Sequence, residues 1–200
     1  MNPDDKDQSL SRRGLIGAAS LVPLAALSAA GTAERKTFSE QRYHIIEAFV
    51  DRLIPTDENG PGALASGVPV YFDRSFGSAL AGERTALESG LDATDAFARR
   101  RHGAAFAELD AKGKDEVLTA MENNEAEGFT PDSRTFFYRV RQLTLEGMFG
   151  DPYYGGNQGF AGWDLIRYPG PRMAVSVEEQ ELRKAIRPVR MSALGGRHGG

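Results

Sequence analysis

Residues that could carry redox or metal chemistry are scarce in this sequence. It contains no cysteine, and its three histidines, His44, His102 and His198, lie far apart without the H-E-x-x-H motif or a similar ligand spacing. The lack of cysteine excludes disulfides, cysteine-ligated zinc, iron–sulfur clusters and haem attachment through C-x-x-C-H. The sequence therefore predicts no catalytic residue, no metal site and no cofactor-binding residue in this chain.

Other patterns that could do chemistry are weak. Asp51 and Asp57 flank the end of a predicted helix, but no second acidic pair faces them, so paired-carboxylate catalysis is unsupported. No G-x-S-x-G motif marks a nucleophilic serine. We interpret His44 as an ordinary, partly buried histidine. The basic run at 99–102 could bind phosphate, but a solvated helix end is favoured, because cations stabilise helix C-termini.

The strongest candidate for a binding element is the stretch 151–171, DPYYGGNQGFAGWDLIRYPGP, which we call the ribbon. It holds the only tryptophan and three of the six tyrosines. Its glycines invite comparison with a nucleotide-binding loop, but that fingerprint needs a strand before it and a helix after it. Here a long predicted helix precedes the glycines, and prolines follow them. Glycines beside large aromatic residues indicate tight turns that seat flat rings against a core or a partner.

Helices must position the ribbon, because apolar residues recur at three- and four-residue steps along much of the chain. The first helix is predicted to be capped by Thr37 or Ser39. It carries an apolar stripe from Ile45 to Ile54 and ends at Pro55, which cannot continue a helix. Few β-branched alternating runs occur, so no substantial sheet is expected. The predicted fold is mostly α, a small irregular helical bundle with a long glycine- and aromatic-rich loop near the C-terminus.

Local signals place the remaining helices. Pro69 suits the first turn of the second helix, and Gly90 weakens the third and marks a candidate bend. Thr130 and Pro131 read as the cap and first turn of the helix before the ribbon. The later helical segments are expected at 68–80, 82–101, 106–109, 112–128 and 136–150.

The amino-acid composition is ordinary for a soluble globular chain, with 40% hydrophobic and 26% charged residues. A net charge of −4 does not suggest a nucleic-acid partner, since such proteins are usually basic. We predict one domain at 34–175, followed at 176–200 by a helix and a flexible tail. The helix would start at Ser176, with Glu179 completing a capping box. The tail is locally basic; it could face an acidic partner, but a solvated tail is favoured.

Residues 1–33 are typical of an export signal. A polar start leads into an uncharged, small-residue run that is too weakly hydrophobic to make a good permanent anchor. The residues before and within it resemble the twin-arginine (Tat) signal S-R-R-x-[FL]-[LI]. The alternative is a plain secretory signal with a chance arginine pair. The signal residues are Ser11, Arg12, Arg13, Leu15 and Ile16.

Longer motifs add a family resemblance. The segment DRLIPTDENGPGALASGV at 51–68 and the pattern T-x-E-G-M-F-G-D-P-x-Y-G-G-N…G-W-x-x-I-x-Y-P-G at 144–170 resemble the gluconate 2-dehydrogenase subunit 3 family. The resemblance runs from about Phe38 to Pro171. Its most specific part lies in the ribbon, at Asp151-Pro152, 154–157, Gly162-Trp163 and 168–170.

The resemblance implies a small, non-catalytic subunit of a membrane-associated, FAD-dependent sugar or sugar-acid dehydrogenase. In such complexes a large flavoprotein subunit of the glucose-methanol-choline (GMC) type carries FAD and oxidises the substrate. A multihaem cytochrome c subunit passes the electrons on. The small subunit carries the Tat signal, engages the Tat translocon and escorts the large subunit to the periplasm. It also supports maturation of the flavoprotein, and the complex is associated with the cytoplasmic membrane.

The ribbon is the expected docking surface for the flavoprotein, because aromatic residues dominate interface energetics. The competing interpretation, that the rings close the core of this chain, stays open, above all for the tryptophan. Two other functions also remain: an independent periplasmic oxidoreductase and an envelope-binding protein. The expected docking residues are Asp151, Pro152, Tyr153, Tyr154, Gly155, Gly156, Asn157, Trp163, Tyr168 and Pro169.

Overall fold

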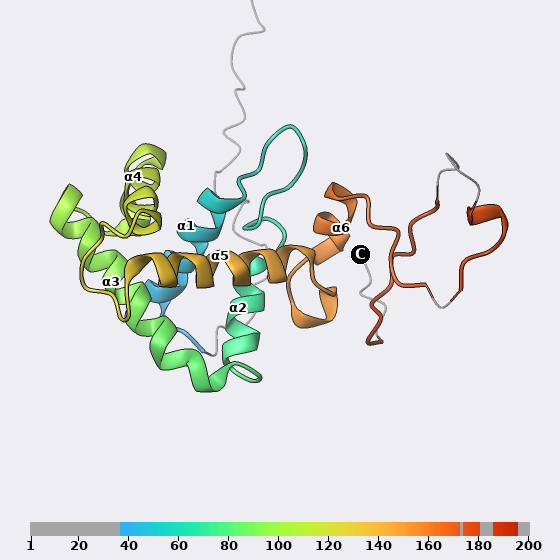
Figure 1. Ribbon diagram of the computed structural model, residues 1–200, viewed down its shortest axis with the longest axis horizontal. Helices are drawn as coiled ribbons and strands as arrows, with labels where there is room; N and C mark the ends of the chain where they lie inside the picture. Colours follow the sequence, from blue (N-terminus) through green and yellow to red (C-terminus); the bar gives the residue numbers. More distant parts are fainter. Residues whose placement is uncertain (1–36, 173, 181–185, 196–200) are drawn as a thin grey trace, which may run out of the picture. The chain divides into compact units, whose positions relative to one another are not determined.

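Helices account for the regular structure of the described residues. The computed structural model describes residues 37–172, 174–180 and 186–195, so the predicted export signal with Ser11, Arg12, Arg13, Leu15 and Ile16 lies outside the described residues. Within these ranges no strand forms, and the fold is mostly helical as predicted (Figure 1). The α-helices are α1 (Glu40–Leu53), α2 (Val68–Phe76), α3 (Arg84–His102), α4 (Ala111–Glu122), α5 (Ser133–Phe149) and α6 (Ala161–Leu165). Single 3₁₀ turns are η2 (Ala81–Glu83), η3 (Phe106–Glu108), η4 (Pro152–Tyr154), η5 (Gln158–Phe160) and η6 (Glu178–Gln180).

The boundaries of α1 and α2 agree with the capping residue and the prolines that the sequence places there. The hydroxyl of Ser39 caps α1 by accepting the backbone N–H of Arg42 at 3.4 Å. Thr37, the other predicted cap, instead donates its hydroxyl to the Asp73 carbonyl at 2.7 Å. α1 ends before Pro55, and Pro69 lies in the first turn of α2. In the described part of the chain, no helix has the length and apolar character that a bilayer crossing requires.

The start of α5 differs from the prediction. Thr130 and Pro131 are joined by a cis peptide bond and lie before the helix, so they are not its cap and first turn. Asp132 is the cap, because its carboxylate accepts both the N–H and the hydroxyl of Thr135, each at 2.9 Å. These hydrogen bonds, the backbone one first, lower the pKa of Asp132. A short acidic side chain just outside a helix satisfies an N–H that has no partner within the helix.

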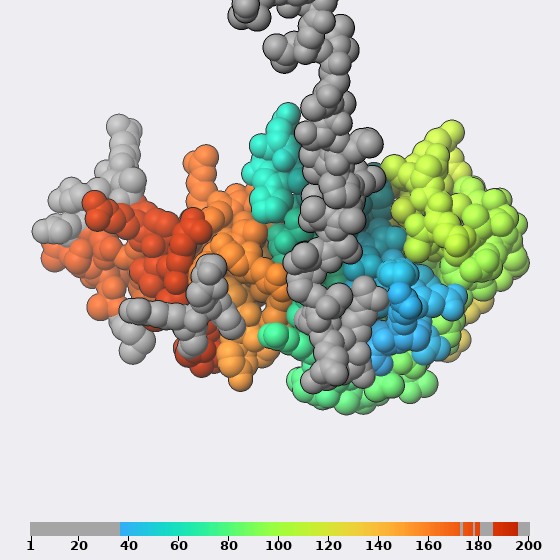
Figure 2. Space-filling view, turned by 180° about the vertical axis from the view of Figure 1, so that it is seen from behind, coloured from blue at the N-terminus to red at the C-terminus, as the bar shows by residue number. Residues whose placement is uncertain are grey.

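The C-terminal helix predicted from Ser176 is not formed by the described residues. The capping box itself is present: Glu179 donates its N–H to Ser176 Oγ at 3.3 Å, and Ser176 donates its N–H to Glu179 Oε2 at 3.0 Å. Only the 3₁₀ turn η6 follows, and residues 186–190 are not helical. Pro188 lacks an N–H and restricts the residue before it. The segment instead returns to the ribbon, and the two lie together in Figure 2 (orange and red).

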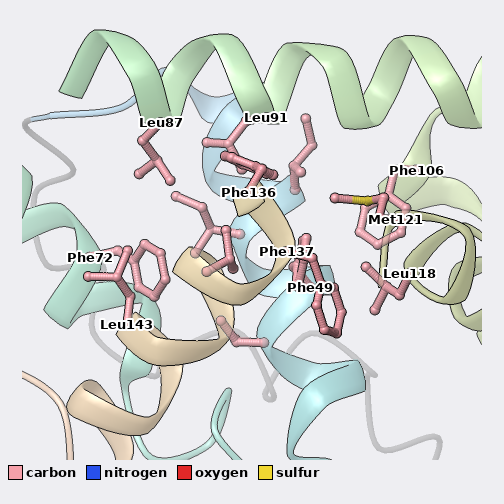
Figure 3. Packing of buried hydrophobic residues seen from close by; sticks show 14 of the residues in the cluster. Phe49, Phe72, Leu87, Leu91, Phe106, Leu118, Met121, Phe136, Phe137 and Leu143 are labelled. Atoms are coloured by element: carbon pink, nitrogen blue, oxygen red, sulfur yellow. The ribbon is translucent and has the colours of Figure 1, made fainter. Parts of the chain in front are cut away.

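The core forms around α5, which contacts α1, α2, α3 and α4. Its buried side chains follow the helical spacing, and Figure 3 shows Phe136, Phe137 and Leu143 pointing toward the neighbouring helices. Phe49 of α1 is fully buried, with its ring centroid 6.0 Å from that of Phe137 and 6.1 Å from that of Phe106. Burying each side chain of this kind contributes about 2–3 kcal/mol to the stability of the folded state.

Gly90 has a packing role instead of marking a break. α3 is continuous from Arg84 to His102, and the ring of Phe136 lies directly over Gly90. A Cβ at this position would lie 2.0 Å from the ring, so the lack of a side chain lets α5 approach α3. The helix propensity of glycine is low, but the close helix contact explains its presence here.

Candidate functional site

The ribbon begins after the C-terminal end of α5, and its backbone packs very close to the last turn of that helix. A Cβ at Gly156 would lie 2.1 Å from the carbonyl oxygen of Gly147, and one at Gly162 would lie 1.8 Å from that of Met148. Both glycines are buried. Only glycine allows the two backbones to pack this tightly, so these residues fix the ribbon against the helical body.

Asn157 holds the turn inside the ribbon. It is fully buried and has a φ of +47°, in the left-handed region that asparagine tolerates. Its Nδ2 donates to the Gly150 carbonyl at 2.9 Å, and its Oδ1 accepts the N–H groups of Gly162 at 2.8 Å and Trp163 at 3.4 Å. Asn157 therefore joins the end of α5 to the start of α6.

This arrangement weakens the nucleotide-loop interpretation further, although the expectation that no helix follows the glycines was wrong. A short helix, α6, does follow the glycines, ahead of the prolines that were expected to prevent it. However, the backbone N–H groups of Gly162 and Trp163 at its start already bind the Asn157 side chain. A phosphate bound at a helix start needs such N–H groups to be available.

Trp163 faces inward. Its side chain is 6% exposed, and its indole N–H donates to the carbonyl of Phe149, the last residue of α5, at 2.9 Å. Its ring centroid lies 5.4 Å from that of Phe160 and 4.9 Å from that of Tyr168. The tryptophan therefore closes the core of this chain and does not offer its ring to a partner.

Three tyrosines of the ribbon face outward. Tyr153 and Tyr154 are 51% and 49% exposed and meet edge to face, with centroids 5.3 Å apart. Tyr168 is 40% exposed beyond the edge of the tryptophan. The carboxylate of Asp151 caps the turn below the pair, since its Oδ1 accepts the N–H of Tyr153 at 2.9 Å.

The other predicted docking residues support this surface from below. Pro152 and Gly155 are buried, and Pro169 is half-buried. Gly155 has a φ of +101° and lies against the side chains of Val70 and Arg74 on α2. The predicted docking set therefore divides into supporting residues and exposed tyrosines.

Exposed apolar side chains gather in and after the ribbon. Of the twelve large hydrophobic residues exposed in the described part of the chain, nine lie at or beyond residue 153. Such a concentration is typical of an interaction site, whereas single exposed apolar residues are normal. The nine residues are Tyr153, Tyr154, Ile166, Tyr168, Val175, Val177, Ile186, Met191 and Leu194.

Sequence reasoning missed the part of this region that comes from residues 186–194, which we call the strap. The N–H of Val189 donates to the Pro169 carbonyl at 2.8 Å, and Arg190 pairs with Asp164 at 2.7 Å. These contacts were not predicted for the tail, although most strap residues are exposed, as expected of a solvated segment. No spacing signal could have found these contacts, because they join residues far apart in the sequence.

The remaining candidates do not form a reactive site. His44 is exposed, not partly buried as predicted, and its Nε2 lies 4.0 Å from the Glu47 carboxylate. The basic run is the solvated last turn of α3, as expected, with Arg99 paired to Asp95 at 3.0 Å. Among the described residues, no group of acidic side chains and histidines could hold a metal ion.

Comparison with known proteins places this architecture in a family. The family model for gluconate 2-dehydrogenase subunit 3 matches residues 40–170, from the start of α1 to near the end of the ribbon. Searches of curated proteins and of solved structures find no match. The matched residues cover more than half of the chain and include α1 to α6, while the strap lies beyond them. The chain therefore belongs to the gluconate 2-dehydrogenase subunit 3 family, which implies a small subunit with partners in that dehydrogenase complex.

Proposed function

We propose that this chain is the non-catalytic small subunit of an FAD-dependent sugar or sugar-acid dehydrogenase, and that it escorts the large flavoprotein subunit through Tat export. FAD belongs to the large GMC-type subunit, and haem c belongs to a multihaem cytochrome subunit. The complex works in the periplasm at the cytoplasmic membrane. The small subunit also supports the maturation and stability of the flavoprotein.

The observation that carries the proposal is the outward-facing pair Tyr153 and Tyr154, of which Tyr154 belongs to the motif that carries the family resemblance. Tyr153 and Tyr154 are about half exposed, although aromatic side chains gain most from burial. Their turn is held by Asp151 and by the close approach of Gly155 to α2, so the pair has a fixed position before any partner binds. A preformed aromatic surface loses little conformational entropy on association.

Some residues of the ribbon support its fold, and others are exposed for docking. Asn157 and Trp163 face inward and hold the ribbon against α5, so their replacement would act on stability. Tyr153 and Tyr154 are about half exposed and meet each other edge to face, so their replacement should act mainly on binding. This division makes the docking role testable without unfolding the chain.

The experiment co-expresses the full chain with the flavoprotein subunit and follows where both proteins accumulate. The double variant Tyr153→Ala, Tyr154→Ala should lose about 2 kcal/mol or more of binding, which is about thirtyfold in affinity. The flavoprotein should then stay in the cytoplasm while the variant small subunit is still exported. The melting temperature of the variant should match that of the wild type.

Tyr138 provides the matched control. It is 46% exposed, like the pair, but lies on α5 outside the ribbon. Tyr138→Ala should leave co-export of the flavoprotein unchanged. Full export of the flavoprotein with the double variant would contradict docking through the pair, and sugar oxidation by the purified small chain alone would support the independent oxidoreductase instead.

A further inference from the structure

The strap is attached along the ribbon by contacts that the sequence did not predict. Four contacts attach it, and they follow each other in antiparallel order, so that later strap residues meet earlier ribbon residues or their neighbours. Such an ordered set of contacts defines a single position for the strap. The pairs are Arg187 with Arg172, Val189 with Pro169, Arg190 with Asp164, and Ala193 with Asp151.

One carboxylate joins the strap to the exposed tyrosines. Asp151 Oδ1 accepts the N–H of Tyr153 at 2.9 Å, and its Oδ2 accepts the N–H of Ala193 at 2.7 Å. The two oxygens thus hold the tyrosine turn and the strap in a fixed relation. The strap and the tyrosine pair therefore form one continuous surface.

The strap buries Ser192 and leaves three large apolar side chains exposed. Ser192 is buried and its hydroxyl accepts the N–H of Leu194 at 3.0 Å. In contrast, Ile186, Met191 and Leu194 are 42%, 47% and 53% exposed. A segment that only covered the ribbon would bury its apolar side chains against it, because that burial is what stabilises such a contact.

This end of the chain is also basic. From Arg167 onward the sequence has seven Lys or Arg residues against three Glu, although the whole chain has a net charge of −4. Arg187 is exposed and meets Arg172 through its backbone carbonyl, which leaves its guanidinium out of that contact. Complementary charge steers association and selects partners.

We propose that the strap is the second half of the docking surface for the flavoprotein subunit, and that it fits an apolar recess with an acidic rim. The identity of this partner rests on the proposed function above. Met191 and Leu194 enter the recess beside the tyrosine pair, and Arg187 faces the rim. Asp151 is a positioning residue that keeps the two halves in register.

A protein partner fits the strap better than a lipid surface. Peripheral segments that bind membranes are typically amphipathic helices with one broad apolar face. The described part of the strap is not helical and is fixed by contacts to the ribbon. Fixed apolar side chains in an irregular segment suit a shaped recess on another protein.

The test measures the affinity of the purified full chain for the flavoprotein subunit. Met191→Ala with Leu194→Ala should weaken binding about tenfold without changing the melting temperature, because neither side chain attaches the strap. Arg187→Glu should weaken binding and flatten its salt dependence. Asp151→Asn leaves either Tyr153 or Ala193 without its acceptor and should also weaken binding. Leu145→Ala on α5, a substitution of an exposed leucine outside the region, should bind like the wild type.

The outcomes separate this inference from the proposed function. If the wild type does not bind the flavoprotein, the proposed function fails. If the wild type binds and deletion of residues 186–195 leaves the affinity unchanged, the strap proposal is overturned while the proposed function stands. If that deletion abolishes binding to vesicles of anionic lipid but not to the flavoprotein, the strap is a lipid-binding segment and the proposal is also overturned.

Discussion

The helical body, residues 37–150, and the ribbon with its strap keep their shapes by different means. In the body, apolar side chains at helical spacing meet in one core around α5. In the ribbon, close glycine contacts and the side chains of Asp151 and Asn157 hold an irregular backbone. The body leaves few large apolar side chains exposed, whereas the ribbon and strap expose many. Irregular backbone held by polar contacts can therefore present apolar side chains outward, as a preformed docking surface requires.

The largest effect should come from the core of the body. Phe49→Ala removes a fully buried ring that lies between Phe106 and Phe137, and should lower the free energy of unfolding by about 4 kcal/mol. Chemical denaturation should show the loss by both helical circular dichroism and the fluorescence of Trp163, the only tryptophan. If the Trp163 signal kept its wild-type midpoint, the ribbon would be stable without the body, contrary to the close contact between them.

A smaller and more local effect is expected inside the ribbon. Asn157→Ala removes the donor to Gly150 and the acceptor of two N–H groups at a buried position, which should cost about 2 kcal/mol. The ribbon should loosen first, so the emission of Trp163 should shift to longer wavelength while the helical signal stays near that of the wild type. Asn123→Ala, at an exposed position after α4, is the control and should leave the emission unchanged. Equal shifts of both signals would mean that body and ribbon unfold as one unit.

The helical body could largely be predicted from the sequence, because its determinants are local. The apolar stripe before Pro55 and the position of Pro69 fix where α1 ends and where α2 begins. The role of Gly90 was not predictable, since it depends on the ring of Phe136 from another helix. The cap at Asp132 was missed because Thr130 and Pro131 offered a similar helix-start signal two residues earlier.

The location of the candidate site was also predictable, but not the orientation of its side chains. Aromatic and glycine content singled out the ribbon, and its motif indicated the family that the family model also matches. Whether Trp163 or Tyr153 faces inward depends on turns with positive φ, such as those at Asn157 and Phe160, and composition does not determine these turns. The strap could not be predicted, because three of its four contacts use its backbone groups, which carry no sequence signal.

The smallest effect is expected where the body meets the ribbon. The ring of Tyr71 on α2 packs against Gly147, whose carbonyl on the other side faces Gly156 of the ribbon. Burial of Tyr71 and its 2.7 Å hydrogen bond to Glu146 raise the pKa of its phenol to about 12, from the ordinary value of about 10 that the unfolded chain keeps. The folded state then holds this proton more tightly, so the stabilising contribution is complete below pH about 10 and is lost as the pH rises through about 12. Denaturant unfolding across this range should show a steeper fall in the free energy of unfolding for the wild type than for Tyr71→Phe, in which all other groups titrate alike. Parallel curves for the two proteins would show that the phenol and its hydrogen bond to Glu146 do not contribute to the stability of the folded chain.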